Sequence, residues 1–366
     1  MPDSNQHSLK ISLAICLDRE AMDRYKTVLR HFVVGLVDSS MQVRLVSSDS
    51  RVERLRLGPI QVVRHARLAW PFRTSRLDAL ISDLQSSAPS IIHAFGGDTF
   101  GRAFSLAEAF DADLVIGLTC SQDLEQLGLY DLGRVQRFVS HSSPLSLALL
   151  DQHGVGEERS WVIHPGVRTA TSCKSFAAGR IPAILCTTPF ERGSGVDQLL
   201  RAVRQVIERG RTVMLFLLGS GPLERRYRQL VRELGLSAYV TFANPLGDAS
   251  DAMDGSEIFV NPGVSPGAYV DVLRAMGMGM AVITRSDPMV DYYRHEENAL
   301  ICNPCNASTM AEALFRLLDD VPFARQLASG GLEYVKSTHM MSGMADRLIE
   351  MYRSLALNRA TFSIKE

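Results

Sequence analysis

The sequence is short of net charge and of lysine. Its 39 basic and 40 acidic residues leave a formal charge of -1, and only five of the basic residues are lysines. A chain without a basic excess has no overall field that attracts nucleic acid or anionic lipid. We therefore expect no nucleic-acid partner. Because arginine is abundant along the whole chain, a single arginine cluster says little about a site.

Long apolar runs are also absent. The N-terminal stretch MPDSNQHSLKISLAICLD contains an apolar run of only six or seven residues. Such a run is too short for a membrane span or for the core of a signal peptide. The sequence thus predicts a cytoplasmic protein without a transmembrane segment, and peripheral contact with a membrane stays open.

The six cysteines lack the spacing of a disulfide framework. Most of them lie in apolar runs, where a reduced thiol packs as a small hydrophobic group. Cys302 and Cys305 form the motif CNPC. A redox pair normally opens a helix after a strand, and a zinc site needs a second pair of ligands, which we do not find. We therefore expect packing roles for these two cysteines, and no bound metal.

Short β-branched runs alternate with helical patterns along the chain, which indicates parallel sheets covered by helices. With 366 residues, 46% of them hydrophobic, the chain is long enough for two domains. The predicted strands of the first half are 10–17, 41–48, 60–66, 90–95, 113–120, 137–142 and 160–166, and its helices are 20–38, 74–86, 99–110 and 143–153. Those of the second half are strands 181–188, 212–219, 239–244, 257–263, 280–284 and 298–303, helices 195–209, 222–234, 247–254 and 269–279, and a helical tail at 306–359.

Between the halves, RTATSCKSFAAGR at 168–180 is small, polar and aperiodic, which is typical of a linker. We predict an α/β protein with two Rossmann-like domains facing a cleft. The predicted N-terminal domain is 1–168, and a linker at 169–180 follows it. The predicted C-terminal domain is 181–340, and a C-terminal helix at 341–366 ends the chain. Ligands of such folds bind beyond the carboxyl ends of the strands, at loops that lead into helices.

One such loop contains Gly219, Ser220, Gly221 and Pro222, between a hydrophobic strand and a helix, with proline at a favoured first helical position. Glycines let a ligand approach the backbone, and a helix N-terminus offers free N–H groups to an anion. A tight strand-to-helix turn explains the same residues equally well. Both interpretations stay open.

Several spaced segments together resemble the retaining, family 4 type glycosyltransferases with the GT-B fold. The segments similar to that family's C-terminal half are SGVDQLLRAV, LFLLGSGPLERRYRQLVRELGLSAYVTFAN, EIFVNPG with LRAMGMGMAVI, and HEENALICNP; those similar to its N-terminal half are PSIIHAFGG and SWVIHPGV. The resemblance covers about residues 89–320, in the family's order. It implies a nucleotide-sugar bound by the C-terminal domain, and a last helix that crosses back to the N-terminal domain.

The same resemblance implies that the polar residues of the site have changed. The family's two glutamates fall on Pro266 and Arg274, its arginine and lysine on Pro189 and Ser194, and its histidine on Thr119. Neither a proline nor an arginine side chain accepts a hydrogen bond from a hydroxyl. The surrounding framework is retained: Gly195, Gly219, Gly221, Gly267, Ala275, Met276 and Gly279. We therefore expect a site whose fold is kept and whose chemistry is altered or lost.

The candidate residues follow from this comparison. The predicted nucleotide-sugar-binding residues are Ser194, Gly195, Gly219, Ser220, Gly221, Gly267 and Arg274, and the catalytic candidates are His93, Arg192 and Arg274. Arg192 would replace the lost diphosphate clamp with its bidentate reach, or it is a solvated loop arginine. His93 would contact the acceptor from a strand end, or it makes a structural hydrogen bond there.

Two functions stay open. The first is a divergent glycosyltransferase that moves a hexose from an NDP-sugar to an unknown acceptor, with retention of configuration and without a metal or other cofactor. The second is an inactive protein of the same fold that binds or scaffolds a protein partner, as the changed polar residues suggest. The resemblance favours the enzyme.

Overall fold

The structure is a computed structural model that describes residues 11–67, 72–174, 176, 180–243, 249–263 and 268–363. The chain forms two compact units. One comprises Met1–Gly166 together with Met341–Glu366, and the other is Val167–Met340. No helix among the described residues is both long enough and apolar enough to cross a membrane.

The first unit is built on a seven-stranded parallel sheet with the order β3-β2-β1-β4-β5-β6-β7. All six residues of the inner strand SLAICL are buried, as expected for a parallel strand covered on both faces. The strands are β1 (Ser12–Leu17), β2 (Gln42–Ser47), β3 (Gln61–Arg64), β4 (Ile91–Phe95), β5 (Asp113–Leu118), β6 (Val135–Ser140) and β7 (Ser160–Val162). The helices are α1 (Arg19–Arg24), α2 (Lys26–Asp38), α3 (Arg73–Gln85), α4 (Phe100–Phe110), α5 (Ser121–Leu127), α6 (Ser143–His153) and α13 (Met341–Ser363).

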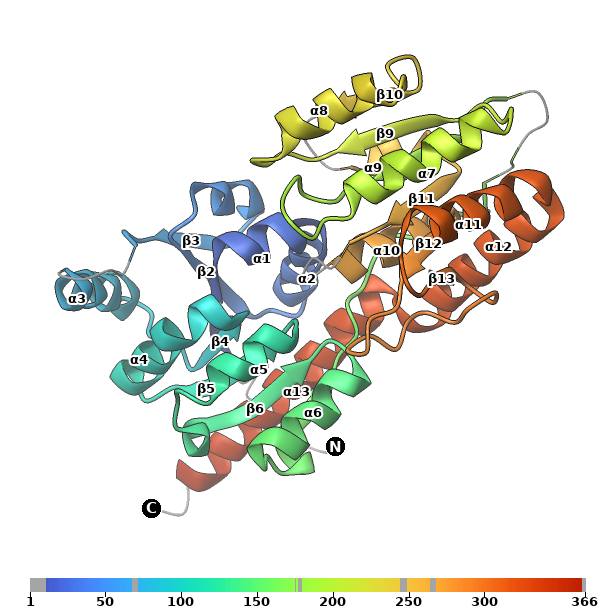
Figure 1. The fold of residues 1–366 in the computed structure, drawn as a ribbon. Coiled ribbons are helices and arrows are strands. Elements are labelled where there is room, and N and C mark those ends of the chain that lie inside the picture. Colours follow the sequence, from blue (N-terminus) through green and yellow to red (C-terminus); the bar gives the residue numbers. More distant parts are fainter. Residues whose placement is uncertain are drawn as a thin grey trace, which may run out of the picture. The chain divides into compact units, whose positions relative to one another are not determined.

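The last helix of the chain completes the first unit. Helix α13, red in Figure 1, packs against α2 near the start of the chain. Met351 and Tyr352 on α13 are fully buried. Gly35 on α2 lies so close that a Cβ there would stand 2.8 Å from the Cβ of Ala345. The two helices therefore touch almost backbone to backbone.

The second unit is built on a six-stranded parallel sheet with the order β10-β9-β8-β11-β12-β13. Its strands are β8 (Ala183–Cys186), β9 (Met214–Leu218), β10 (Val240–Ala243), β11 (Ile258–Asn261), β12 (Ala281–Arg285) and β13 (Leu300–Cys302). Its helices are α7 (Val196–Glu208), α8 (Glu224–Glu233), α9 (Ser250–Asp254), α10 (Ala268–Gly277), α11 (Ala307–Asp319) and α12 (Val321–Thr338). Helix α7 inserts Leu199, Leu200, Val203 and Val206 into the core of this unit, at the spacing of one helical face.

Both sheets have the strand order of a Rossmann fold, which confirms the predicted fold class. In this order the direction of winding reverses between β1 and β4 in the first sheet, and between β8 and β11 in the second. Ligands of open parallel sheets bind beyond the carboxyl ends of the strands at this point. In the second unit, a ligand is therefore expected at the loops after β8 and β11.

The structure differs from the sequence prediction in several places. The predicted helix 20–38 is two helices, which meet at Tyr25, and helix α5 was not predicted. The segment predicted as a linker is attached to the second unit, because the N–H groups of Ala170 and Lys174 donate to the carbonyls of Gly277 and Gly279 at 2.7 and 2.8 Å. The second unit accordingly begins at Val167.

Candidate functional site

The loop after β8 and the turn after β9 are held together by their backbones. The N–H of Phe190 donates to the Ser220 carbonyl at 3.1 Å, and the N–H of Leu223 donates to the Phe190 carbonyl at 2.9 Å. An added Cβ would stand 2.7 Å from the Thr188 carbonyl oxygen at Gly219, and 2.4 Å from the Phe190 carbonyl oxygen at Gly221. The protein's own backbone thus occupies the side that these glycines leave free, which favours the turn interpretation over close approach by a ligand.

Helix α8 begins two residues later than predicted. Its first residue is Glu224 and its N-cap is Leu223. Pro222 therefore belongs to the turn that precedes the helix. Ser220 and Gly221 are exposed, so the outer side of this turn remains accessible.

A second pair of glycines joins the loops after β8 and β11. A Cβ at Gly195 would stand 2.5 Å from the Pro262 carbonyl oxygen, and one at Gly263 would stand 2.4 Å from the Ser194 carbonyl oxygen. Gly195 also has a φ of 71°, which favours glycine. The two loops thus interlock where the winding of the sheet reverses.

Gly193 differs from these glycines. Its φ is 81°, and an added Cβ would meet no atom within 4 Å. The backbone at this position is open on the side that the missing side chain leaves free. Gly193 was not among the predicted binding residues, although its place between Arg192 and Ser194 was a usable signal.

Ser194 occupies the position of the family's lysine and is only 3% exposed. Its hydroxyl lies 2.8 Å from the Tyr227 hydroxyl on α8, and Tyr227 also donates to the Glu191 carbonyl at 3.3 Å. Burial raises the pKa of Tyr227, so its hydroxyl stays protonated. Ser194 therefore ties its loop to α8.

Arg274 lies on α10 with its side chain 14% exposed, and it forms an ion pair with Asp271. The distance from Arg274 Nη1 to Asp271 Oδ1 is 3.0 Å, and the Thr187 hydroxyl donates to Asp271 Oδ2 at 2.7 Å. The positive charge at the position of the second family glutamate is thus matched by a carboxylate. The spacing of Asp271 and Arg274, three residues apart on a helix, could have revealed this pair in the sequence.

Arg192 is the exposed cation of the loop after β8. Within the described part of the chain, no hydrogen bond or ion pair involves its side chain. Its five N–H donors are therefore available to a ligand. Pro266 and Gly267, the other predicted positions of this edge, lie outside the described residues.

His93 lies inside strand β4 and is 1% exposed, which argues against the predicted contact with an acceptor. Its Nδ1 is 2.5 Å from the Tyr352 hydroxyl, and its Nε2 has no partner among the described residues. Burial lowers the pKa of His93 to about 3, so the ring is neutral. A cavity of about 20 Å³ lies against His93 and His141, which is room for one water molecule.

Asp123 organises the carboxyl edge of the first sheet and was missed by the sequence analysis. It accepts hydrogen bonds from the N–H groups of Gly97, Thr119 and Cys120, and from the Thr119 hydroxyl. Thr119, at the position of the family histidine, therefore holds the first turn of α5 through Asp123. The signal in the sequence was an aspartate three residues after a helix N-cap.

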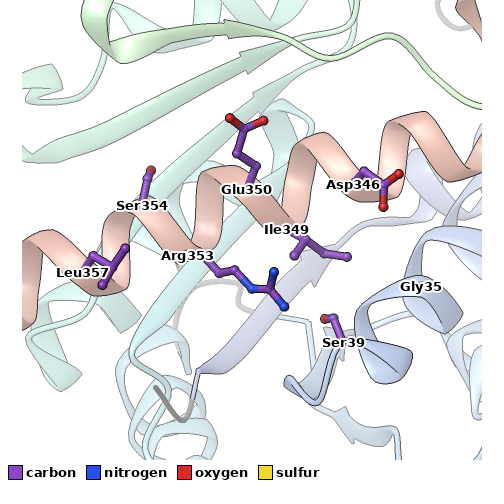
Figure 2. A pocket seen from close by; sticks show the side chains of 8 residues that line it. All are labelled: Gly35, Ser39, Asp346, Ile349, Glu350, Arg353, Ser354 and Leu357. Carbon is purple, nitrogen blue, oxygen red and sulfur yellow. The ribbon is translucent and has the colours of Figure 1, made fainter. Parts of the chain in front are cut away.

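An open groove of about 680 Å³ lies on α2 and α13 (Figure 2). Figure 2 shows Arg353 directed toward Ser39 at the end of α2, while Glu350 points away from α2. Ser39 follows α2 and precedes β2, so the groove lies at the amino edge of the sheet. This is the edge opposite to the one where such folds bind ligands.

Comparisons with known proteins match one family model and several curated relatives. The family described as Glycosyl transferases group 1 matches residues 181–320. A GDP-mannose-dependent alpha-(1-6)-phosphatidylinositol monomannoside mannosyltransferase of Mycobacterium tuberculosis is 25% identical over 192 residues, which are 49% of each chain. The lipopolysaccharide core biosynthesis glycosyltransferase LpsD of Rhizobium meliloti is 27% identical over 165 residues, or 44% of this chain and 47% of LpsD. The chain thus spans about half the length of the curated relatives it matches.

Solved structures match over nearly the whole chain. HepE of Anabaena, in complex with UDP-glucose, has a TM-score of 0.77 at 14% identity, with 94% of this chain and 100% of HepE covered. A sucrose-phosphate synthase from Thermosynechococcus elongatus has a TM-score of 0.77 at 17% identity, with 94% and 99% covered. At sequence identities of 14% and 17%, the similarity to these two structures shows the fold alone.

The chain is thus an α/β protein with two parallel-sheet domains that resemble GT-B glycosyltransferase structures. The group 1 match falls within its second unit. Together these matches support a relationship of the chain to the GT-B glycosyltransferase family.

Proposed function

We propose that the protein is a glycosyltransferase that binds an NDP-sugar at the carboxyl edge of the second sheet and transfers its hexose with retention of configuration. The group 1 match at 181–320 includes the loops after β8, β9 and β11. The named relatives use GDP-mannose or build a lipopolysaccharide core, and HepE was solved with UDP-glucose. A nucleoside diphosphate hexose is therefore the donor class that we expect.

Arg192 is the residue that we expect to bind the diphosphate. A guanidinium gives two parallel hydrogen bonds to phosphate oxygens, and such charge-assisted bonds are stronger than neutral ones. When the sugar leaves, negative charge grows on the departing phosphate, and a fixed cation nearby stabilises that state. Gly193 beside it would let the phosphate approach the backbone. In this proposal no metal ion is needed, because Arg192 supplies the positive charge.

A single observation carries the proposal: an exposed arginine without a partner among the described residues lies beside an open glycine. Both follow the strand where the winding of the matched unit reverses. A solvated arginine would be equally exposed. The titration below therefore distinguishes an Arg192 that binds the ligand from one that contacts only water.

Calorimetric titration with UDP, GDP, UDP-glucose and GDP-mannose tests the donor. We expect one of the two nucleotide classes to bind, and Arg192→Ala to weaken that binding by about tenfold or more, as for the loss of a hydrogen bond to a charged group. Arg225→Ala is a matched control, because Arg225 is an exposed arginine on α8. If none of the four compounds gives heat, the protein has no such donor site.

Two contacts favour a second candidate, an inactive protein that binds a partner. Ser194 is bound to Tyr227 and Arg274 to Asp271, so both changed positions are satisfied within the protein. In this case the chain would bind nucleotide without releasing sugar. Donor hydrolysis that appears only after Pro266→Glu, Arg274→Glu and Ser194→Lys are combined would favour this candidate, and turnover by the native chain would exclude it.

A further inference from the structure

The motif Cys302-Asn303-Pro304-Cys305 lies between a strand and a helix, as the predicted strand 298–303 and the helical tail from 306 imply. Cys302 is the last residue of β13, and α11 begins at Ala307. Asn306 caps this helix, because its side chain accepts from the N–H groups of Ser308 and Thr309. The two cysteines thus span a short connection that is fixed at both ends.

Each thiol of the motif shifts the pKa of the other. A hydrogen bond from Cys305 lowers the pKa of Cys302, and the same bond together with burial raises the pKa of Cys305. The titrations of the two thiols are therefore coupled. Cys302 is buried and Cys305 is half-buried, so a reagent reaches the pair from the side of Cys305.

A positive charge lies next to the pair. Arg285, the last residue of β12, is the register partner of Cys302 across the sheet. Its charge opposes the rise in the pKa of Cys305. Nearby cations favour the thiolate, which is the reactive form in disulfide exchange. Cys16 and Cys186 are fully buried single thiols, and burial raises the pKa of both.

The connection also touches the helix that follows the candidate donor loop. The N–H of Ala307 donates to Gln198 Oε1 at 3.2 Å. Gln198 lies in the first turn of α7, three residues after Gly195, and α7 packs against α11. A change in the backbone between Cys302 and Ala307 therefore reaches the start of α7 through one hydrogen bond.

We propose that Cys302 and Cys305 form a reversible disulfide by exchange with glutathione disulfide, and that this bond alters the start of α7. One protein thiolate attacks a glutathione sulfur, so that a mixed disulfide forms and one glutathione thiolate leaves. The second protein thiolate attacks the protein sulfur of the mixed disulfide and releases the second glutathione. The two protein thiols lose two protons and two electrons, and the two glutathione molecules gain them.

The first experiment measures the bond itself on the full chain. Both cysteines lie in one tryptic peptide, 295–316, which contains no other cysteine and no internal arginine or lysine. After incubation in glutathione buffers, alkylation under denaturing conditions and digestion, we expect this peptide to carry no alkyl group and to be two hydrogens lighter than the dithiol peptide. Dithiothreitol should restore alkylation, while Cys173, a half-buried cysteine of the same unit, stays alkylated throughout.

Two results would contradict the formation of a disulfide between Cys302 and Cys305. One is full alkylation of both cysteines in oxidised glutathione. The other is a stable glutathione adduct on Cys305 in the native chain without closure onto Cys302. In Cys302→Ser such an adduct is expected, because the resolving thiol is missing.

The second experiment measures the coupling by hydrogen exchange. We expect the amides at 196–199 and 303–309 to exchange at different rates in the reduced and oxidised chain, and at equal rates in Cys305→Ser treated with the same oxidant. Equal rates in both redox forms of the native chain would overturn the coupling. This measurement needs no nucleotide, so it does not depend on the proposed function.

A third measurement, which rests on the proposed function, tests whether the disulfide changes nucleotide binding. If the reduced chain binds UDP or GDP, the disulfide should change the dissociation constant about fivefold or more, which is the range of ordinary coupling between sites. An unchanged constant would contradict coupling to the donor site. A reduced chain that binds neither nucleotide counts against the proposed function, while the mass and exchange results still decide the thiol pair.

Discussion

At the scale of single residues, partners distant in the sequence decide the roles of the polar candidates. His93 and its partner Tyr352 are 259 positions apart, and Ser194 and Tyr227 are 33 apart. A histidine after a hydrophobic run reads the same in the sequence whether it faces a ligand or a tyrosine. The contact across the fold makes His93 a structural residue here.

The neutral histidines of the first unit should make it sensitive to acid. Burial lowers the pKa of His93 and of His141 to about 3, against an ordinary value of 6.5. The unfolded chain therefore binds protons at a higher pH than the folded chain, and the free energy of unfolding falls as the pH drops from about 6.5 toward 3. At pH 5 each histidine should cost about 2 kcal/mol.

Tryptophan fluorescence during urea unfolding at pH 7 and pH 5 measures this effect. Both tryptophans, at positions 70 and 161, belong to the first unit, so the signal reports on it alone. We expect His93→Gln to lose about half of the acid effect. An unchanged effect in that variant would show that other groups cause it.

Ser194 provides a second prediction at this scale. Ser194→Ala removes one hydrogen bond to Tyr227 and should cost about 1 kcal/mol. Ser194→Lys, which restores the residue of the family, places a longer and charged side chain in a position that is 3% exposed, and should cost about 2 kcal/mol or more. Calorimetric unfolding of the two variants checks the order. A lysine variant as stable as the alanine variant would mean that the loop opens easily.

At the scale of elements, the sequence was sufficient for the strands and most helices. Alternating β-branched and helical patterns located each strand of both sheets, because buried parallel strands are nearly continuous apolar runs. The break at Tyr25 was not predictable, since the apolar pattern continues across it. Helix α5 was missed because its start depends on Asp123, which also accepts a hydrogen bond from Gly97, 26 positions away.

The functions of the glycines could not be predicted from the sequence. The residue type shows that a side chain is absent, and only the fold shows what lies in its place. At Gly221 and Gly195 a carbonyl of a neighbouring loop lies there, and at Gly193 there is open space. The glycines selected for ligand contact therefore mostly serve packing, and ligand binding at these loops stays a prediction.

Gly193 and Gly221 allow a matched test of this difference. Both have positive φ, 81° and 155°, so an alanine is strained at either position by about 1–2 kcal/mol. At Gly221 the alanine Cβ would also stand 2.4 Å from the Phe190 carbonyl oxygen. We expect Gly221→Ala to destabilise the second unit by about 2 kcal/mol more than Gly193→Ala, measured by calorimetric unfolding. Equal losses would mean that the 188–190 loop moves away at little cost.

At the scale of the whole molecule, the chain leaves the first unit at Gly166 and returns to it at Met341. The return was expected from the family resemblance alone, because nothing in the apolar pattern of the tail shows which unit it covers. Each unit has a core of its own. Among the described residues, the core cluster of the second unit includes none from α13.

Removal of α13 should therefore unfold the first unit and spare the second. The helix buries Leu348, Met351, Tyr352 and Leu355 in the first unit, each less than 7% exposed. At about 1.5–3 kcal/mol for each buried side chain, their loss amounts to about 6–12 kcal/mol, which is comparable with the whole stability of a domain. In a chain ending at Met340, hydrogen exchange should become fast in β1 and β4 and remain slow in β8, β11 and β12. A chain ending at Arg359, which keeps these four residues, should retain slow exchange in both sheets. Slow exchange of β1 and β4 in the shorter chain would contradict the prediction, because the remaining strands and helices would then suffice to hold the first core.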